Sequence, residues 1–149
     1  MMKILFICHG NICRSPMAEF ICKDLAAKRG IKGLTIASAA TSNEEIGNPV
    51  YPPAKAELKK HGISCEGKRA RRITAADYRE YDLLICMDSF NIRNALRIFG
   101  EDKEGKLVKL MSFANSDGDV ADPWYTDRFD IAYSDIYKGC LGLLDKINL

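Results

Sequence analysis

Short apolar runs alternate along the chain with segments whose apolar positions repeat at helical spacing. The runs are short enough to be buried β-strands, and they lie at residues 3–7, 34–38, 82–87 and 106–111. The helical spacing predicts helices at residues 15–30, 54–60, 74–81, 89–98 and 126–147. Ser15 and Pro16 are typical of a helix start, and Glu19 would favour that N-terminal turn.

The order strand, loop, helix repeats along the whole chain, which predicts a parallel sheet with helices on both faces. We therefore expect an α/β fold of three layers (αβα). No repeat, low-complexity segment or linker divides the 149 residues, so a single domain is expected over residues 1–149. Such folds bind ligands at the carboxyl ends of their strands. The segment CHGNICRS, residues 8–15, directly follows the first strand and is therefore a candidate site.

Composition excludes several classes of function. A net charge of +2 is too small to indicate a nucleic-acid partner. The longest apolar run, residues 4–8, is too short for a membrane span or a secretory signal, so we expect no membrane partner and a cytoplasmic location. The six cysteines should then be mostly reduced thiols. They show no C-x-x-C spacing and no zinc pattern with His9 and His61, so neither a metal nor another cofactor is expected.

The pattern C-x5-R-S between a strand and a helix has the chemistry of an anion cradle. Backbone N–H groups of residues 9–14 can converge on one point, and the following helix directs its positive end there. Arg14 can add a bidentate fork to a tetrahedral oxyanion. Gly10 and Asn11 tolerate the left-handed backbone that a tight loop needs. The pattern alone is weak evidence, but the strand before it and the helix after it make an accidental match improbable.

The same positive field favours the thiolate form of Cys8. A thiolate beneath a bound phosphate is placed as a nucleophile for attack at phosphorus. The Ser15 hydroxyl can hydrogen-bond the sulfur and assist its later departure. The phosphate-binding loop therefore comprises His9, Gly10, Asn11, Ile12, Cys13, Arg14 and Ser15.

Several segments of the sequence resemble those of a known family. CHGNICRSPMAE is similar to the catalytic loop of the low-molecular-weight protein tyrosine phosphatases, and ADPWYTD to their second signature. ASAATSNEEIGNP, KRARRIT and DLLICMDSFNIRNA resemble further family segments in the expected order, so the likeness spans nearly the whole chain. The resemblance implies a metal-independent phosphatase with four parallel strands in the order 2-1-3-4. Its substrates would be phosphotyrosine proteins and aryl phosphates, and its product inorganic phosphate.

The family mechanism carries over to Cys8 as nucleophile, Arg14 as phosphate clamp and Asp122 as general acid and base, through a cysteinyl-phosphate. The neighbouring aromatics of Asp122 would also desolvate its carboxyl and favour its protonated form. Ser38 matches the serine that supports the loop asparagine, Asn11. The supporting histidine of the family is replaced by Lys68.

The resemblance also implies the pocket walls. Trp124 fills one wall, with Tyr125 beside it, but the opposite wall falls at Glu44, where many members have an aromatic. A glutamate cannot stack on a phenol ring and would repel acidic peptides. His9 would lie on the rim. A threonine in place of Ile12 accompanies phosphoarginine hydrolysis in related enzymes, so Ile12 favours phosphotyrosine.

In the family, the second cysteine of the loop can form a reversible disulfide with the catalytic cysteine. The resemblance therefore implies that Cys13 can form such a disulfide with Cys8. The alternative is that Cys13 is a small residue packed behind the loop. Three alternative functions are weighed: an arsenate reductase, a phosphoarginine phosphatase and a non-catalytic phosphate-binding module. An arsenate reductase needs further relay cysteines, and no second cysteine follows Cys86 in residues 87–100. Ile12 disfavours phosphoarginine, and a binding module would need neither a thiolate nor an acid, so Cys8 and Asp122 argue against it. A monomer or a weak dimer is expected.

Overall fold

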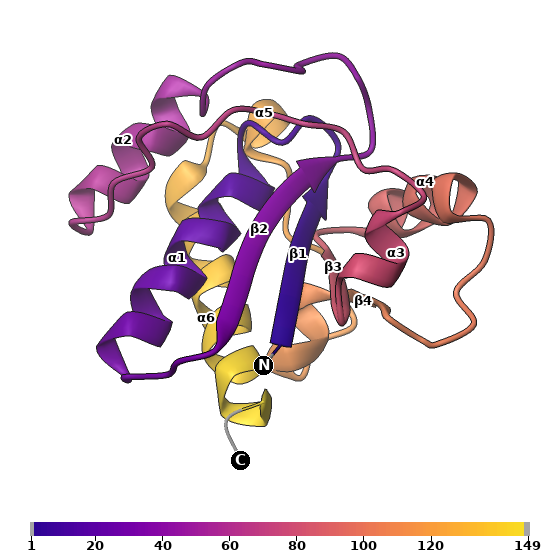
Figure 1. Ribbon diagram of the computed structural model, residues 1–149. Helices are drawn as coiled ribbons and strands as arrows, with labels where there is room; N and C mark the ends of the chain where they lie inside the picture. The colour runs from indigo at the N-terminus through magenta and orange to yellow at the C-terminus, as the bar shows by residue number, and fades with distance from the viewer. Residues whose placement is uncertain (1, 148–149) are drawn as a thin grey trace.

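The computed structural model describes residues 2–147, and within that range four strands form a parallel sheet in the order β2-β1-β3-β4 (Figure 1). The strands are β1 (Met2–Cys8), β2 (Leu34–Ala40), β3 (Leu83–Cys86) and β4 (Leu107–Lys109). The helices are α1 (Arg14–Lys28), α2 (Pro52–Lys60), α3 (Asp77–Glu80), α4 (Ser89–Phe99), α5 (Pro123–Thr126) and α6 (Phe129–Ile147), with a 3-10 turn η1 (Leu110–Ala114). No described helix is long and apolar enough to cross a membrane. The expected fold class and strand order are confirmed.

Helices cover both faces of the sheet, because its central strands are apolar on both sides. In β1, Ile4 and Phe6 pack into a core with α1, α2 and α6, whereas Leu5 and Ile7 pack into a second core with residues of α3 and α4. All four side chains are fully buried. Successive strand residues face opposite sides, so a continuous apolar run is what a strand covered on both faces requires. Figure 1 shows the two helical layers on either side of the sheet.

The strand register brings the carboxyl ends of the strands to one edge. Cys8, the last residue of β1, pairs with Ala40, the last residue of β2. One position earlier, Ile7 pairs with Cys86 at the end of β3, and Cys86 pairs with Lys109 at the end of β4. The loops that follow the strands therefore all begin close to Cys8.

The boundaries differ from the sequence prediction mainly at the C-terminal half. The fourth strand ends at Lys109 instead of residue 111, because the chain turns there into η1 and buries Leu110 completely. The terminal helix starts at Phe129 instead of residue 126. Asp127 adopts a left-handed φ of 58°, which ends the short helix α5 and separates it from α6.

The start of α1 also differs. The helix begins at Arg14, and its N-cap is Cys13, which has no side-chain capping bond. The prediction that Ser15 is the N-cap was therefore wrong, and its hydroxyl is free for other contacts. Glu19 was expected to favour the N-terminal turn, but the first turn of α1 holds no acidic residue. Glu19 lies beyond that turn, and its buried side chain accepts a hydrogen bond from Ser38 Oγ at 2.6 Å.

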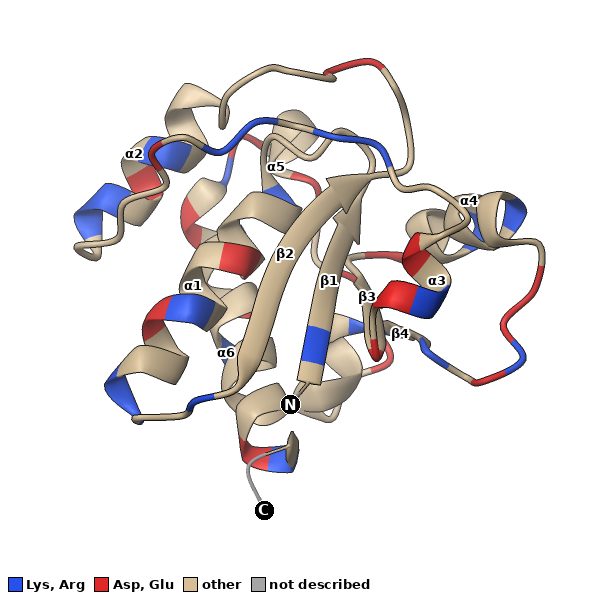
Figure 2. Ribbon diagram, in the orientation of Figure 1, with Lys and Arg blue, Asp and Glu red and all other residues tan. Residues whose placement is uncertain are grey.

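The basic segment 68–72 crosses above the carboxyl ends of β1 and β2 (Figure 2). Ala40 N donates to Arg71 O at 2.7 Å, and Ala70 N donates to Asn48 O at 2.9 Å. The segment is thus attached both to the end of β2 and to the long loop before α2. This attachment holds that loop over the sheet edge where Cys8 lies.

Candidate active site

The loop between β1 and α1 curls around the Cys8 sulfur. Asn11 adopts a left-handed φ of 58°, which lets the chain reverse within five residues of the strand end. The first turn of α1 has neither a side-chain cap nor an acidic residue, so its backbone N–H groups remain available. A helix N-terminus with free N–H groups attracts an anion, and here it follows directly on the loop.

Cys8 is buried at the floor of this loop. Its Sγ accepts a hydrogen bond from Asn11 N at 3.3 Å and lies 2.9 Å from Ser15 Oγ. Two hydrogen-bonding groups therefore converge on the sulfur. These contacts come from the loop and the first turn of α1, so they depend on the local fold of residues 8–15.

The Arg14 side chain is fixed by hydrogen bonds to residues outside the loop. Its Nη1 donates to Asp88 Oδ2 and to the carbonyl of Val120, both at 2.8 Å, and its Nη2 lies 3.5 Å from Asp122 Oδ2. The side chain is 3 % exposed. Burial alone would lower the pKa of the Arg14 guanidinium, but the negative charges of Cys8, Asp88 and Asp122 outweigh burial and raise it. The guanidinium is therefore a fixed cation whose Nη2 edge faces the pocket.

Asp122 lies at the start of α5 and caps that short helix. Its Oδ1 accepts a hydrogen bond from Trp124 N at 3.0 Å, while its Oδ2 faces Arg14. Pro123 occupies the first helical position and fixes the backbone after the aspartate. The cap and the proline together hold the carboxyl at the mouth of the loop.

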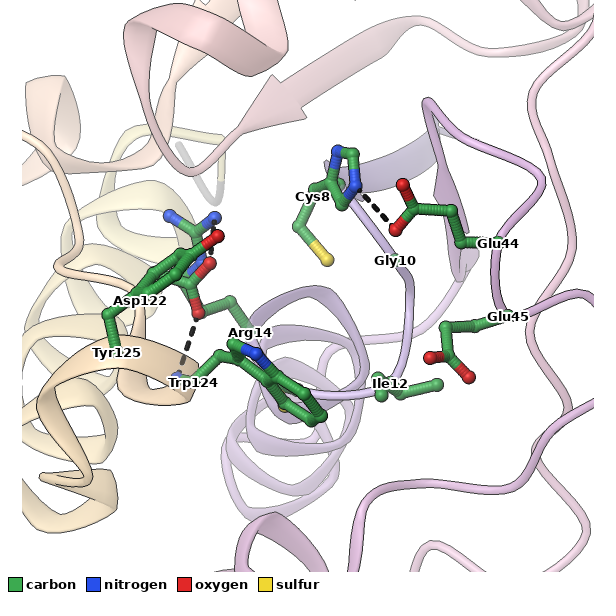
Figure 3. A pocket seen from close by; sticks show the side chains of 11 residues that line it. Cys8, Gly10, Ile12, Arg14, Glu44, Glu45, Asp122, Trp124 and Tyr125 are labelled. Carbon is green, nitrogen blue, oxygen red and sulfur yellow. Dashed lines mark hydrogen bonds and ion pairs between the residues drawn. The ribbon is translucent and has the colours of Figure 1, made fainter.

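Two walls rise above the Cys8 sulfur and enclose a cavity of about 230 Å³. Figure 3 shows Asp122, Trp124 and Tyr125 on one side and Ile12, Glu44 and Glu45 on the other. The residues that line the cavity are Cys8, His9, Gly10, Ile12, Cys13, Arg14, Glu44, Glu45, Asp122, Trp124 and Tyr125. The two loops, far apart in sequence, therefore meet over the Cys8 sulfur.

The wall opposite Trp124 is acidic. His9 Nε2 and Glu44 Oε2 lie 2.9 Å apart, which ties the phosphate-binding loop to the long loop after β2. Glu45 Oε2 accepts a hydrogen bond from Asn48 Nδ2 at 2.5 Å. Glu44 therefore lines the pocket wall opposite Trp124, where the resemblance had placed it, and Glu45 adds a second carboxylate there.

An aromatic partner of Trp124 comes from a position that the sequence did not single out. The Tyr51 ring centroid lies 4.9 Å from that of Trp124 and 6.1 Å from that of Phe129. Tyr51 N also donates to Ile12 O at 2.9 Å. Tyr51 thus connects the Trp124 wall, the start of α6 and the phosphate-binding loop. The sequence gives little indication of this role, because Tyr51 lies in a proline-containing loop without the periodicity of a helix or strand.

A network of buried polar side chains braces the loop from below. Asn11 Nδ2 donates to Ser15 Oγ at 2.8 Å and to Ser38 Oγ at 2.9 Å. Ser38 Oγ donates in turn to Glu19 Oε1 at 2.6 Å, and Lys68 Nζ donates to the Ser38 carbonyl at 2.9 Å. The brace around Asn11 is therefore present, with Lys68 in the expected place and with Glu19 as a further member that the sequence did not reveal.

Cys13 has a different environment from Cys8. Burial, together with the nearby charge of Cys8, raises the pKa of the Cys13 thiol to about 12. Cys13 is consequently a neutral thiol at neutral pH. The structure places both cysteines beside the pocket, and the Cys8 sulfur contacts Asn11 N and Ser15 Oγ.

Comparison with known proteins gives one consistent result. The family described as low molecular weight phosphotyrosine protein phosphatase matches residues 3–149. The chain belongs to this family. The Bacillus subtilis low molecular weight protein-tyrosine-phosphatase YfkJ is 40 % identical over 99 % of this chain and 96 % of that protein. Its crystal structure superposes with a TM-score of 0.95 and 39 % identity, covering 99 % of this chain and 95 % of that chain.

A second solved structure, that of the Drosophila arginine phosphatase DARP, has a TM-score of 0.91 at 29 % identity and covers 99 % of both chains. The chain is thus a low molecular weight protein tyrosine phosphatase, a hydrolase of phosphoric monoesters. Its fold also resembles that of a protein whose name gives a different phosphatase activity.

The phosphatase pocket brings together most of the residues expected from the sequence. Cys8, Arg14, Asp122, Trp124 and Tyr125 all line it. Asn11, Ser15 and Ser38 lie beneath it and contact the loop instead of the cavity, as supporting residues should. Asp88 caps α4 by accepting a hydrogen bond from Asn91 N and also accepts one from Arg14, so it contributes to the helix and to the site.

Proposed function

We propose that this phosphatase hydrolyses phosphotyrosine in proteins without a metal, with Cys8 as nucleophile, Arg14 as phosphate clamp and Asp122 as general acid and base. The observation that carries this proposal is the position of the Cys8 sulfur. It lies at the floor of the cavity, below the free N–H groups at the start of α1 and beside the fixed guanidinium of Arg14. A dianionic phosphate would meet positive potential from both sides there.

The first step follows from this geometry. The thiolate of Cys8 attacks phosphorus in line, the new S–P bond forms, and the P–O bond to the tyrosine breaks. Arg14 and the loop N–H groups hold the equatorial oxygens, where charge rearranges. Asp122 transfers its proton to the departing phenolic oxygen. When a phosphate oxygen binds Arg14 Nη2, it takes the place of Asp122 Oδ2, which leaves that oxygen free to carry the proton.

In the second step water attacks the cysteinyl-phosphate. Asp122 now accepts a proton from the water, the new O–P bond forms, and the S–P bond breaks. Cys8 leaves as a thiolate beside Ser15 Oγ, and inorganic phosphate is the product. Microscopic reversibility allows one carboxyl to serve as acid in the first step and base in the second.

The test is hydrolysis of an activated aryl phosphate in the presence of EDTA. We expect turnover in the wild type and none in Cys8→Ser. Arg14→Lys keeps the charge but loses the planar fork, so it should lower kcat strongly. Full activity of Cys8→Ser, or loss of wild-type activity on chelation, would refute the proposed mechanism.

Phosphoarginine is the second candidate substrate, because Glu44 and Glu45 could accept hydrogen bonds from its guanidinium. Ile12 argues the other way, since its apolar side chain lines the same wall and suits a phenol ring better than a cation. We propose that phosphotyrosine is preferred. Comparing kcat/KM for a phosphotyrosine peptide and a phosphoarginine peptide decides between them, and a higher value for phosphoarginine would reverse the assignment.

We also propose that Cys8 and Cys13 form a disulfide on oxidation, which would protect Cys8 from irreversible oxidation. Both side chains line the same cavity, and the six cysteines are free thiols in the structure. Peroxide treatment followed by peptide mapping tests this pairing. A bond from Cys8 to Cys86, or stable over-oxidation of Cys8 alone, would contradict it.

For the molecule as a whole we propose one domain over residues 1–149, a cytoplasmic location and a monomer or weak dimer. A catalytic thiolate needs a reducing compartment, which agrees with six unpaired cysteines. Sedimentation over a range of concentrations measures the oligomeric state. A tight dimer at nanomolar concentration would contradict the proposed monomer or weak dimer.

A further inference from the structure

Exposed apolar side chains gather around the active-site pocket. Within residues 2–147, four large apolar side chains are more than half exposed: Ile46, Phe90, Trp124 and Tyr125. Trp124 and Tyr125 line the pocket itself, and Ile46 follows Glu45 of the opposite wall. Single exposed apolar residues are normal on a protein surface, but a group of them indicates a binding surface. Phe90 is the member of this group for which the proposed reaction gives no role.

Phe90 lines a second cavity, of about 410 Å³, beside the active-site pocket. We call this cavity the Phe90 groove, and its own walls include Phe90, Asn94, Asp119, Val120 and Ala121. The two cavities are continuous, because four residues line both of them: His9, Arg14, Asp122 and Tyr125. A substrate segment that leaves the pocket over His9 and Tyr125 therefore enters the Phe90 groove.

Hydrogen bonds fix the position of the Phe90 groove relative to Cys8. Asp88 Oδ1 accepts from Asn91 N at 2.7 Å, and Asn91 Oδ1 accepts from Asp88 N at 3.1 Å. This capping box orders the first turn of α4, which carries Phe90. Asp88 Oδ2 also accepts from Arg14 Nη1 at 2.8 Å. The turn that presents Phe90 is thus connected directly to the phosphate-binding loop.

The exposed surface of the Phe90 groove suits an apolar side chain. Phe90 of α4 is 66 % exposed, and Tyr125, which α5 contributes, is 84 % exposed. An apolar group that covers both rings removes their surface from water, which favours binding. Asp88 and Asp119 also line the groove, so an acidic side chain would meet like charges there. The groove therefore favours an uncharged, apolar occupant.

The geometry of an extended peptide gives the spacing between the two bound side chains. Successive side chains of an extended segment face opposite sides, so the residues two positions before and after a phosphotyrosine face the same way as its ring. Their Cα atoms lie about 7 Å from that of the phosphotyrosine. This spacing suits two adjoining cavities with shared walls. Asn94 also lines the groove, and its amide can both donate to and accept from the peptide main chain.

We propose that the Phe90 groove is a substrate subsite that binds a large apolar side chain two residues from the phosphotyrosine of the target protein. The proposal rests on the proposed function, because it concerns the substrate of that same reaction. Recognition then has two parts. The phosphate-binding loop holds the phosphoryl group that all substrates share, and the Phe90 groove selects among the sequences around it.

The experiment measures kcat/KM by phosphate release from three phosphotyrosine peptides of otherwise identical sequence. One has alanine both two residues before and two residues after the phosphotyrosine, and the others have leucine at one of these positions. We expect leucine at one position to raise kcat/KM about 10-fold over the alanine peptide, mainly through KM. In Phe90→Ala this ratio should fall to about 2-fold or less. Because each ratio is taken within one variant, a uniform loss of active protein cancels.

Controls separate the Phe90 groove from apolar surface in general. Leu96→Ala removes another exposed apolar side chain of α4, which does not line the groove, and should keep the wild-type ratio. Phe90→Leu keeps an apolar group and should keep most of the ratio. A further peptide with glutamate in place of the leucine tests Arg93, whose guanidinium carbon lies 5.4 Å from the Phe90 ring centroid. We expect glutamate to give no gain over alanine.

Several results would overturn the proposal. They are equal kcat/KM for the alanine and leucine peptides, a leucine gain that Phe90→Ala retains, and a preference for glutamate over leucine. Equal rates together with self-association that Phe90→Ala abolishes, measured by sedimentation, would assign the groove to a second copy of the chain. If the wild type hydrolyses none of the peptides, or Cys8→Ser hydrolyses them, the proposed function itself fails, so the two failures are distinguishable.

Discussion

The two carboxylate oxygens of Asp122 have different contacts. Oδ1 accepts a hydrogen bond from Trp124 N, and Oδ2 lies 3.5 Å from Arg14 Nη2. The proposed general acid must deliver a proton to the leaving oxygen. In the proposed mechanism a phosphate oxygen takes the place of Oδ2 at Arg14 Nη2, so that Oδ2 becomes free to carry that proton.

The first prediction concerns Asp122→Ala. We expect a loss of ~10²–10³-fold in kcat for phenyl phosphate, whose leaving group needs protonation, and a much smaller loss for a nitrophenyl phosphate. Steady-state kinetics on a series of substituted phenyl phosphates measures the dependence on leaving-group pKa. An equal loss across the series would remove Asp122 from the acid role.

The second prediction concerns Cys13 and alkaline pH. Its thiol pKa is raised from 9.0 to about 12, so above pH 9 the unfolded chain loses a proton that the folded protein keeps. Because the unfolded chain then binds fewer protons than the folded protein, rising pH destabilises the folded state. Through Cys13 alone, the free energy of unfolding should fall by up to ~1.4 kcal/mol per pH unit between pH 9 and pH 12. Urea unfolding with a reductant should therefore show a steeper fall for the wild type than for Cys13→Ala. Parallel curves would contradict the burial of a neutral Cys13 thiol.

At the scale of elements, the catalytic wall is built where α5, α6 and the loop before α2 meet. Helix α5 has only four residues, so its position depends on its neighbours more than on its own hydrogen bonds. Tyr51 packs between Trp124 of α5 and Phe129 of α6. The ring of Tyr51 therefore sets how far Trp124 can move away from the pocket.

The third prediction tests this packing. Tyr51→Ala removes the aromatic contact, which is worth ~0.5–1.5 kcal/mol beyond the buried area, and should raise KM for phosphotyrosine roughly 5-fold through a looser wall. Tyr51→Phe keeps the ring and the backbone bond to Ile12 O, so it should behave like the wild type. If both variants show the wild-type KM, Tyr51 has no part in placing Trp124.

At the scale of the whole molecule, the C-terminal helix closes the fold on one face of the sheet. Helix α6 packs against α1, α2 and η1, and it approaches η1 through two glycines. A Cβ on Gly142 would lie 1.9 Å from the Phe113 carbonyl oxygen. Since that oxygen belongs to the backbone, it cannot rotate away, and the two elements would have to separate.

The fourth prediction is that Gly142→Ala lowers the free energy of unfolding by about 3 kcal/mol, although alanine is the better helix former. Gly118→Ala is the matched control. Its added Cβ would meet only the Ser116 hydroxyl at 3.2 Å, in an exposed loop, so little change is expected. Denaturant unfolding measures both variants, and an unchanged midpoint for Gly142→Ala would show that η1 can move.

The chain's own pattern was enough to predict the strands, most helices and the catalytic loop. Apolar runs such as residues 3–7 report burial directly, and the loop motif was recognisable because its eight residues are consecutive. Predictions failed where a distant contact changed a local preference. Ser15 is a favourable N-cap by type, but the Cys8 sulfur and Asn11 take its hydroxyl. Glu19 was expected to favour the helix start, but it lies beyond the first turn and its side chain contacts Ser38 and Lys68.

The sequence by itself determined the α/β class, because this class follows from the order and the apolar pattern of the elements. It also predicted Cys8, Arg14 and Asp122 as nucleophile, clamp and acid from residue type, spacing and family resemblance. Only the tertiary structure decided what surrounds these residues. It brought Tyr51 beside Trp124, placed Glu45 with Glu44 in the pocket wall, and paired Glu19 with Lys68 beneath the loop. The reason is physical: these contacts join residues on separate elements, and their geometry exists only when the sheet and its helical layers are assembled.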